Sequence, residues 1–526
     1  MGAPTEKLSR FSLRSLAGPL LALLLTSCVA AVGPGQDGPI DRHELFSEGY
    51  ERISHYYIES TTAERLGLAG LGRLSMLDPA ISVERRGDAV VLMKDAAVIG
   101  RYEAPPAADN WGWGGVTAAA LETARQASPK LASASEDQLD KAVFDGAVGT
   151  LDRFSRYSTP ETARDQRAER NGFDGIGVTL DAEETEVRIV SVLPGGPAEQ
   201  AGIKANDKIV GIDGTPTSTL TREQVVQRLR GPAGSRVTIA IMRDSATEPR
   251  NVAVSRAHIV LPTVTVQREG RIAIFRISSF NQETADQLVE AFGKAEHEIG
   301  GPPAGIVLDL RDNPGGLLDQ SISVANVFLS EGLVVSTAGR LPESRKQFFA
   351  EPSHLTDGIP MTVLVNGGSA SASEIVAAAL QDRGRAVVIG TSSFGKGTVQ
   401  TVLELVNDGE LTVTWAKLLS PEGYTIHEHG VVPTLCTADL GEDQASFSHA
   451  MEVGTTLGTG LAASPRSALD EQGWKTLRDS CPAQRVDRVA DLKLAEQLLR
   501  DPALYARALN VTPTRFSHTA AVPTTR

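Results

Sequence analysis

The spacing of apolar residues along the chain predicts a helical beginning, a strand-rich middle and a later segment in which strands alternate with helices. Apolar side chains recur at helical spacing over residues 41–80, and a second helical stretch runs from Asp137 to Leu151. The sequence between them contains one predicted strand, Ala89 to Met93. We therefore expect a helical N-terminal region, residues 41–166, with an insert near 80–135. Two segments of the insert predict loop: Pro105-Pro106 and Trp111-Gly-Trp113.

Short runs of β-branched residues, bounded by glycine and proline, begin near Gly172 and predict a strand-rich unit. One helix, Thr221 to Arg230, interrupts these strands and has Thr219 or Thr221 as a favourable N-cap. The four predicted strands are Ile176–Leu180, Val187–Val192, Ile209–Ile212 and Val237–Met242.

From Ile259 onward, predicted strands alternate with predicted helices, which is typical of βαβ units and of a sheet covered by helices. The strands are Ile272–Ile277, Gly305–Leu310, Met361–Val365 and Ala386–Ile389, and the helices are Glu283–Glu298, Asp319–Leu329 and Ala372–Gln381. The tail from Ala438 onward is helical in pieces, notably from Asp491 to Leu509. The fold class predicted by these patterns is a multidomain α/β protein.

The first 30 residues have the order of an export signal. Basic residues precede an apolar run from Leu16 to Leu25, which is short for a membrane span, and small residues and Cys28 follow. Leu25-Thr26-Ser27-Cys28 fits a lipoprotein signal, with Cys28 as the lipidated residue; an ordinary cleavage site fits nearly as well, and an uncleaved anchor is the third alternative. Each alternative exports the remaining chain, so we expect a location in the bacterial cell envelope, in the periplasm or attached to the membrane through the N-terminus.

Composition and charge narrow the protein class without naming a function. The chain has 526 residues, enough for about three or four domains, with 41% hydrophobic and 22% charged residues, as in soluble globular proteins. Its net charge of −14 argues against a general nucleic-acid binder. Three cysteines are too few for a disulfide scaffold, and whether Cys436 and Cys481 pair after export stays open.

Two closely spaced glycines predict an anion-binding turn in the strand-rich unit. Gly175, Ile176 and Gly177 can direct successive backbone N–H groups into one concavity, which suits a peptide's terminal carboxylate. Downstream, the order of Val192-Leu-Pro-Gly-Gly-Pro-Ala198 and Asp207-Lys-Ile-Val-Gly-Ile-Asp-Gly214 resembles a PDZ domain over residues 167–258. That resemblance implies recognition of an extended C-terminus, with Gly175, Ile176 and Gly177 as the carboxylate loop.

A serine-rich segment lies where a predicted strand meets a predicted helix. In Val365-Asn-Gly-Gly-Ser-Ala-Ser-Ala-Ser-Glu-Ile375, Ser371 stands beside a helix N-terminus, where free N–H groups favour negative charge. The simpler alternative is that these small residues only cap the helix.

A glycine-flanked lysine supplies the base that a serine nucleophile needs. Lys396, in Ser393-Phe-Gly-Lys-Gly-Thr-Val-Gln400, can act as that base if burial lowers its pKa, with Gln400 holding the amine. The rival interpretation is a phosphate-binding loop beginning at Gly390. That match fails because Gly397 stands where a hydroxyl residue is needed, and a predicted strand follows where a helix is required.

The two segments together resemble the C-terminal processing peptidases, or tail-specific proteases, whose hallmarks are SASASEI and SFGKGxVQ segments. The resemblance covers about residues 137–435, and the 25-residue separation of Ser371 and Lys396 suits the family. It implies that Ser371 is the nucleophile, Lys396 the general base and Gln400 its orienting residue. Ser369 and Ser373 are the alternative serines, with expected structural roles.

The resemblance also implies an oxyanion hole made of backbone N–H groups from Ala372 and from Gly315 or Gly316, which lie in a glycine turn after a predicted strand. Two groups of residues could bind a metal. Asp309 and Asp312 lack a nearby His or Cys, and a surface loop is the favoured interpretation of His427 and His429. We expect neither a metal nor a cofactor.

The full prediction is a PDZ domain at 167–258, a peptidase core at 259–435 of the ClpP/crotonase-like type and a helical C-terminal extension at 436–526. The predicted function is serine endopeptidase cleavage of proteins near exposed, apolar C-termini, with a homo-oligomer left open. The alternative is a catalytically silent PDZ adaptor. The chain departs from the family pattern at Arg153, where proline is usual, and at Thr434, where aspartate is usual.

Overall fold

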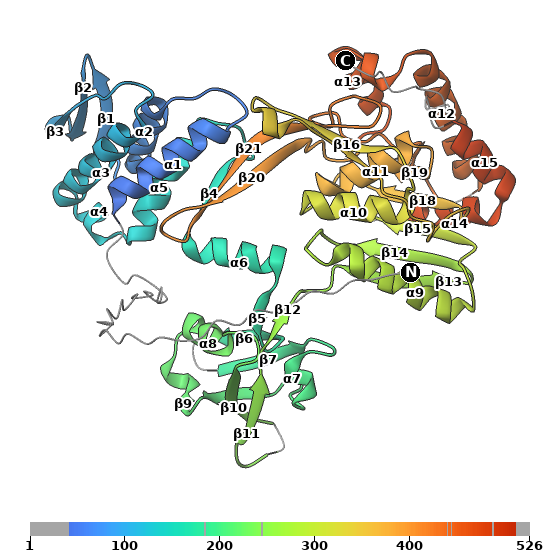
Figure 1. Cartoon of the computed structure of the whole chain (residues 1–526), viewed down its shortest axis with the longest axis horizontal. Coiled ribbons are helices and arrows are strands. Elements are labelled where there is room, and N and C mark those ends of the chain that lie inside the picture. Colours follow the sequence, from blue (N-terminus) through green and yellow to red (C-terminus); the bar gives the residue numbers. More distant parts are fainter. Residues whose placement is uncertain are drawn as a thin grey trace, which may run out of the picture. The chain divides into compact units, whose positions relative to one another are not determined.

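The computed structural model describes residues 41–183, 186–243, 246–438, 440–442, 444–486 and 489–511 (Figure 1). The predicted export signal and Cys28 lie outside these residues. Across the described ranges, no helix is both long enough and apolar enough to span a bilayer.

The N-terminal region is a helical cluster with a small antiparallel sheet of order β1-β2-β3. Large side chains that include Phe46, Tyr50, Trp113 and Phe144 are fully buried in its core. The predicted helical character of this region is therefore confirmed. Its elements are α1 (Arg42–Tyr56), α2 (Ala63–Gly72), β1 (Ile81–Arg86), β2 (Ala89–Lys94), β3 (Ala97–Glu103), α3 (Asn110–Ala127), α4 (Pro129–Ser133) and α5 (Glu136–Val148).

The loop predicted at Trp111-Gly-Trp113 is wrong, because these residues form the first turn of α3. Asp109 caps the helix by accepting a hydrogen bond from the Gly112 amide. Glycine is needed here for close packing, since a Cβ on Gly114 would lie 2.6 Å from the backbone nitrogen of Ser47 in α1. Gly114 thus marks a close contact between α1 and α3.

The strand-rich unit forms one sheet of order β11-β10-β8-β7-β6, with β9 paired to β8, and a separate pair, β5 with β12. Helix α8 begins after Thr221, which makes the capping box with Gln224. The elements are α6 (Pro160–Asn171), β5 (Phe173–Gly175), β6 (Val178–Glu183), β7 (Glu186–Val192), α7 (Pro197–Gln200), β8 (Lys208–Ile212), β9 (Thr215–Pro216), α8 (Arg222–Leu229), β10 (Arg236–Met242), β11 (Arg250–Ser255) and β12 (Ala257–Ile259).

The alternating unit is built on a sheet of order β13-β14-β15-β18-β19-β22, in which the strands from β14 onward run parallel. The strands are β13 (Val264–Glu269), β14 (Ile272–Ile277), β15 (Gly305–Asp309), β18 (Met361–Val365), β19 (Val387–Gly390) and β22 (Leu435–Cys436). The helices are α9 (Thr284–Ile299), α10 (Leu318–Phe328), α11 (Ala372–Asp382), α12 (Gln444–Ala463), α13 (Glu471–Asp479), α14 (Val489–Arg500) and α15 (Pro502–Asn510).

Both faces of this sheet are covered, and the chain's last helices supply one of the two layers (Figure 1). Ile306 and Leu308 of β15 pack in the cluster that includes α9, α10 and α11. Between them in sequence, Val307 packs in a second cluster with Leu494 and Leu498 of α14. The alternation follows from the two-residue period of a strand. The helical C-terminal extension therefore completes the core of the predicted peptidase unit.

The same unit contains a second sheet, of order β17-β16-β21-β20, and β4 pairs with β21 of this sheet. Its strands are β4 (Arg156–Ser158), β16 (Leu333–Ala338), β17 (Lys346–Phe349), β20 (Thr398–Glu404) and β21 (Glu410–Leu419). Leu403 and Leu411 from β20 and β21 are buried in the core of the N-terminal helical region. The hairpin thus joins the two hydrophobic cores.

A disulfide bond joins Cys436 in β22 to Cys481, just after α13, with the two Cα atoms 5.8 Å apart. Cys481 is fully buried. The pairing that the sequence left open is therefore made, and it ties the C-terminal extension to the last strand of the main sheet.

Candidate active site

Ser371 differs in position from the two serines beside it. It is the N-cap of α11, it is half-buried, and it lines a cavity of about 680 Å³. Ser369 and Ser373 are fully buried, and their hydroxyls donate to the carbonyl oxygens of Leu310 and Asn313 at 2.7 and 3.0 Å. Of the three serines, Ser371 is thus the one that faces the cavity.

The backbone at Ser371 lies at φ 57° and ψ −113°, a region that residues with a side chain rarely adopt. Such strain concentrates at functional sites, where the surrounding structure holds it. Here the strained turn connects the buried loop after β18 to the first turn of α11, which places the hydroxyl at the helix N-terminus.

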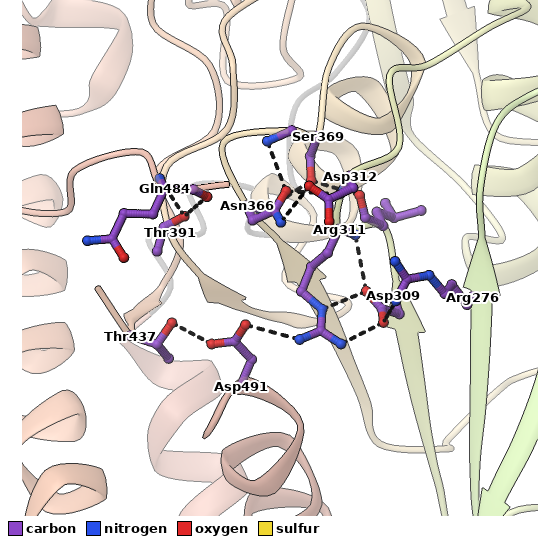
Figure 2. A network of polar contacts seen from close by, with 12 residues as sticks. Arg276, Asp309, Arg311, Asp312, Asn366, Ser369, Thr391, Thr437, Gln484 and Asp491 are labelled. Carbon is purple, nitrogen blue, oxygen red and sulfur yellow. Dashed lines mark hydrogen bonds and ion pairs between the residues drawn. The ribbon is translucent and has the colours of Figure 1, made fainter. Parts of the chain in front are cut away.

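Figure 2 shows a network of polar contacts that holds Asn366 and Ser369, in the loop between β18 and Ser371. Asn366 donates from its side-chain amide to Asp312 Oδ1 and accepts from the Asp312 backbone amide, while its own amide donates to Ser369 Oγ. Asp309 accepts two hydrogen bonds from the buried Arg311 guanidinium. Both aspartates weighed as metal ligands are therefore held by neighbours in the protein.

Lys396 lines the same cavity and is half-buried. Its Nζ atom lies 5.6 Å from the centroid of the Phe154 ring. Burial, followed by the charge of Arg156, lowers the pKa of Lys396, while Glu374 and Asp152 act in the opposite direction. Within the described part of the chain, Lys396 Nζ makes neither a hydrogen bond nor an ion pair. The Lys396 ammonium therefore loses its proton more readily than that of an ordinary lysine.

Gln400 extends from β20 into the same cavity. Its side-chain amide nitrogen donates to the hydroxyls of Thr398 and Thr414, at 2.8 and 3.2 Å. These contacts hold the Gln400 amide group between β20 and β21. Among the described residues no hydrogen bond links the side chains of Ser371, Lys396 and Gln400 to each other, so the structure gathers the three around one cavity without joining them.

The backbone donors near Ser371 are not equivalent. The Gly315 amide already donates to Asn313 Oδ1, at 2.8 Å. In the described ranges the amides of Gly316 and Ala372 donate to no acceptor, and both residues line the cavity. Gly315 is instead a steric requirement, since a Cβ on it would lie 2.8 Å from Ser371 Cβ, at a φ of +100°.

Glu374 was not among the predicted site residues, and it is fully buried. One carboxylate oxygen accepts from the amides of Ser371 (2.7 Å) and Lys396 (2.9 Å), and the other accepts from Ser393 Oγ (2.5 Å) and the Gly395 amide (2.7 Å). Burial raises the pKa of Glu374, and these four hydrogen bonds oppose that rise. The capping-box spacing of Ser371 and Glu374 was the available signal.

The predicted carboxylate loop has free donors. The Ile176 and Gly177 amides donate to no acceptor among the residues that the structure describes. Together with Gly175 they line a cavity of about 220 Å³ bounded by β6 and α8. A peptide carboxylate requires such a cradle next to a strand edge.

His427 and His429, the other pair weighed for metal, flank a turn at Glu428, where φ is 65°. The ring of His429 stacks on Trp474 of α13 at 4.3 Å. The nucleotide-loop alternative required a helix after Lys396, and the structure has strand β20 there.

Comparison with known proteins gives matches to both units. Residues 162–242 match the PDZ domain model, and residues 271–436 match peptidase family S41. A carboxy-terminal-processing protease of Bartonella bacilliformis is 41% identical over 302 residues, covering 57% of this chain and 70% of that protein. A probable CtpA-like serine protease of Staphylococcus aureus is 35% identical over 302 residues, covering 57% of this chain and 60% of that protein. The solved photosystem II D1 C-terminal processing protease is 24% identical, with a TM-score of 0.38, covering 75% of this chain and 92% of that one.

Proposed function

The chain belongs to peptidase family S41, and from this premise we propose that it is an exported serine endopeptidase that cuts proteins near their C-termini. The observation that carries the proposal is the position of Ser371. It alone of the three neighbouring serines faces the cavity, and that cavity also contains Lys396 and Gln400.

In the proposed mechanism, neutral Lys396 accepts the Ser371 hydroxyl proton as Oγ attacks the scissile carbonyl. The C–N bond then breaks, the protonated lysine gives its proton to the leaving amine, and an acyl-enzyme on Ser371 remains. Water attacks this ester with Lys396 again as the base, which releases the new C-terminus and restores the serine.

The lowered pKa of Lys396 supports its role as the base, because a lysine with its ordinary pKa is almost fully protonated near neutrality. Among the described residues the Gln400 side-chain oxygen accepts no hydrogen bond, so it suits an acceptor for the lysine ammonium once the amine has taken the proton. The proposal requires these side chains to move within the cavity until they form this hydrogen bond.

The amides of Gly316 and Ala372 are the proposed oxyanion donors, because both line the cavity and neither is engaged within the described residues. Each such donor is typically worth about 3 kcal/mol of transition-state stabilisation. We assign Gly315 the steric role that its contact with Ser371 suggests.

The PDZ unit is the proposed site of tail recognition. The free Ile176 and Gly177 amides suit a terminal carboxylate, and the mainly apolar lining, which includes Val178 and Leu180, suits an apolar final residue. The predicted export signal supports a location in the cell envelope, and the Cys436–Cys481 disulfide fits an oxidising compartment.

The experiment is cleavage of one unfolded model protein that carries either an apolar or a charged C-terminal tail. The full chain should cut the apolar-tailed substrate faster, and Ser371→Ala should cut neither. A Ser371→Ala protein that binds the apolar tail normally but cleaves nothing matches the proposal. A wild-type protein that binds tails and never cleaves would instead identify the chain as a PDZ adaptor.

A further inference from the structure

Two arginines hold the buried carboxylate of Glu410 on β21, and a third arginine, Arg156, lies on the strand that pairs with β21. Arg170 donates to both oxygens of Glu410, at 2.9 Å, and Arg167 donates to one of them, also at 2.9 Å. Arg167 also lies 3.7 Å from Glu404 at the surface. The guanidinium of the third arginine, Arg156, has no hydrogen bond or ion pair with any described residue. Glu410 accepts three hydrogen bonds from the other two arginines.

Arg156 belongs to a row of side chains that faces the cavity. In the paired strands Arg156 of β4 lies opposite Thr412 of β21, and Thr412 lies opposite Val402 of β20. Directly opposed residues of antiparallel strands project from the same face of a sheet. All three line the cavity that contains Ser371 and Lys396.

The hydroxyl of Thr412 is a second, independent sign that this row receives a ligand. Thr412 is 3% exposed, and its Oγ1 atom has no hydrogen-bond partner among the described residues. A buried hydroxyl without a partner costs free energy that a ligand acceptor would recover. An unpaired guanidinium and an unpartnered hydroxyl therefore face one space.

We propose that Arg156 and Thr412 form a carboxylate-binding subsite of the cleavage cavity, which selects substrates with a carboxylate close to the scissile bond. Guanidinium groups bind carboxylates through charge-assisted hydrogen bonds, and Thr412 supplies a neutral donor. Val402, 40% exposed, supplies an apolar wall. The inference rests on the proposed peptidase function of the same cavity, and it deepens that function by naming a preference of the substrate.

The position of the row limits which substrate residue it reaches. Gln400 and Val402 are two residues apart on β20, about 7 Å, and Arg156 is two strands away, about 10 Å. The long Arg156 side chain carries its guanidinium part of the way from β4 toward Gln400. The carboxylate is therefore expected within about four residues of the scissile bond. Glu169, exposed on α6, also lines the cavity and opposes an acidic substrate there.

Two sources supply a carboxylate: an Asp or Glu side chain and the substrate's own C-terminus. A peptide series with one Asp, or with Asn at the same place, is cut by the full-length enzyme, with each peptide made as the free acid and as the amide. If the subsite binds an Asp side chain, the peptide with Asp at one particular position should have a kcat/KM about tenfold higher than the peptide with Asn there. Amidation of the C-terminus should leave this preference unchanged. For a terminal carboxylate, amidation lowers kcat/KM and the cut lies at a fixed distance from the end.

The enzyme variants test the assignment. Arg156→Gln should reduce the acid preference to near unity, Arg156→Lys should retain part of it, and Thr412→Val should weaken it. Arg153→Gln, a change at an exposed neighbouring arginine, is the matched control. The preference is a ratio measured on one enzyme, so a uniform change in the reactivity of Lys396 cancels from it. An equal preference in wild type and Arg156→Gln at every position, or no preference at all in wild type, would overturn the subsite.

Binding separates this test from that of the peptidase function. If the full chain cleaves no peptide, the proposed function fails, and fluorescence anisotropy of amidated Asp and Asn peptides with Ser371→Ala still reports on the subsite. Tighter binding of the Asp peptide that Arg156→Gln abolishes supports it. Equal binding of the two peptides contradicts it.

Discussion

The Oε2 atom of Glu374 lies 2.7 Å from the backbone nitrogen of Ser371 and accepts its hydrogen bond. The same oxygen accepts from the Lys396 amide, so one buried carboxylate connects the backbone of the proposed nucleophile to that of the proposed base. Glu374 thereby fixes the separation of the two segments, while both side chains stay free to face the cavity.

Replacing Glu374 by glutamine should damage activity more than it damages folding. A glutamine amide turns two of the four acceptor positions into donors, which leaves amides of the Ser371 or Lys396 segment without partners. An unsatisfied buried group costs about 1–3 kcal/mol, so we expect kcat/KM to fall at least tenfold and the melting temperature to fall by several degrees. The exposed Glu404→Gln change is the control and should leave both quantities near wild type.

Adding a methyl group at Gly315 should abolish turnover. The new Cβ would lie 2.7 Å from the Ala370 carbonyl oxygen and 2.8 Å from Ser371 Cβ, at a φ of +100° that favours glycine. We expect Gly315→Ala to lose at least 100-fold in kcat while tail binding to the PDZ unit is retained, as measured by fluorescence anisotropy.

Gly293 in α9 is a matched glycine, since nothing lies within 4 Å of its missing Cβ. Gly293→Ala should keep full activity and gain up to about 1 kcal/mol of stability from helix propensity. Full activity in Gly315→Ala would contradict the steric role of that glycine.

The pH dependence of cleavage should report the lowered pKa of Lys396. The neutral amine is the active form, so kcat/KM rises as pH rises through the pKa of Lys396, which burial and Arg156 hold below its ordinary value. Removing the positive charge in Arg156→Gln allows that pKa to rise, so the same limb should move to higher pH. The measurement is the pH profile with an uncharged substrate, and an unmoved limb would show that Arg156 does not act on the lysine.

Breaking the Cys436–Cys481 disulfide should loosen the C-terminal extension. The bond closes a span of 45 residues, for which a stabilisation of about 2–4 kcal/mol is typical. Activity should suffer too, because Arg478 of α13 donates to the Ser393 carbonyl, and the Gln484 carbonyl accepts from the Gly367 amide beside the serine loop. Dithiothreitol should lower the melting temperature of the wild type and leave a Cys436→Ser/Cys481→Ser variant unchanged; equal responses would contradict this account.

The sequence predicted best those elements that are fully buried and are flanked by residues that typically end a strand or helix. Met361–Val365 was predicted with its observed bounds, because all five residues are buried and Pro360 and Asn366-Gly367 flank them. Trp111-Gly-Trp113 was predicted as loop, but it begins α3, and the neighbouring Gly114 allows α1 and α3 to approach. Local signals report a glycine's conformational freedom, and they do not report a neighbouring helix.

In the candidate site too, residues recognisable from a local segment were predicted, and residues that depend on distant contacts were missed. The glycine and serine segments identified Ser371, Lys396 and Gln400, and the structure gathers them around one cavity. Glu374 and Arg156 were missed because their roles depend on contacts across the chain: Glu374 reaches the 393–396 segment, and Arg156 pairs across β4 and β21. Residue spacing within one segment cannot predict either of these contacts.

The most direct test of the proposed mechanism is to trap the acyl-enzyme. The full-length protein is mixed with an activated peptidyl ester, quenched in acid within milliseconds to seconds, and mapped by tandem mass spectrometry. We expect one adduct, on Ser371, that is absent in Ser371→Ala and strongly reduced in Lys396→Ala at neutral pH. An adduct on Ser369, Ser373 or another residue, or an undiminished adduct in Ser371→Ala, would contradict it.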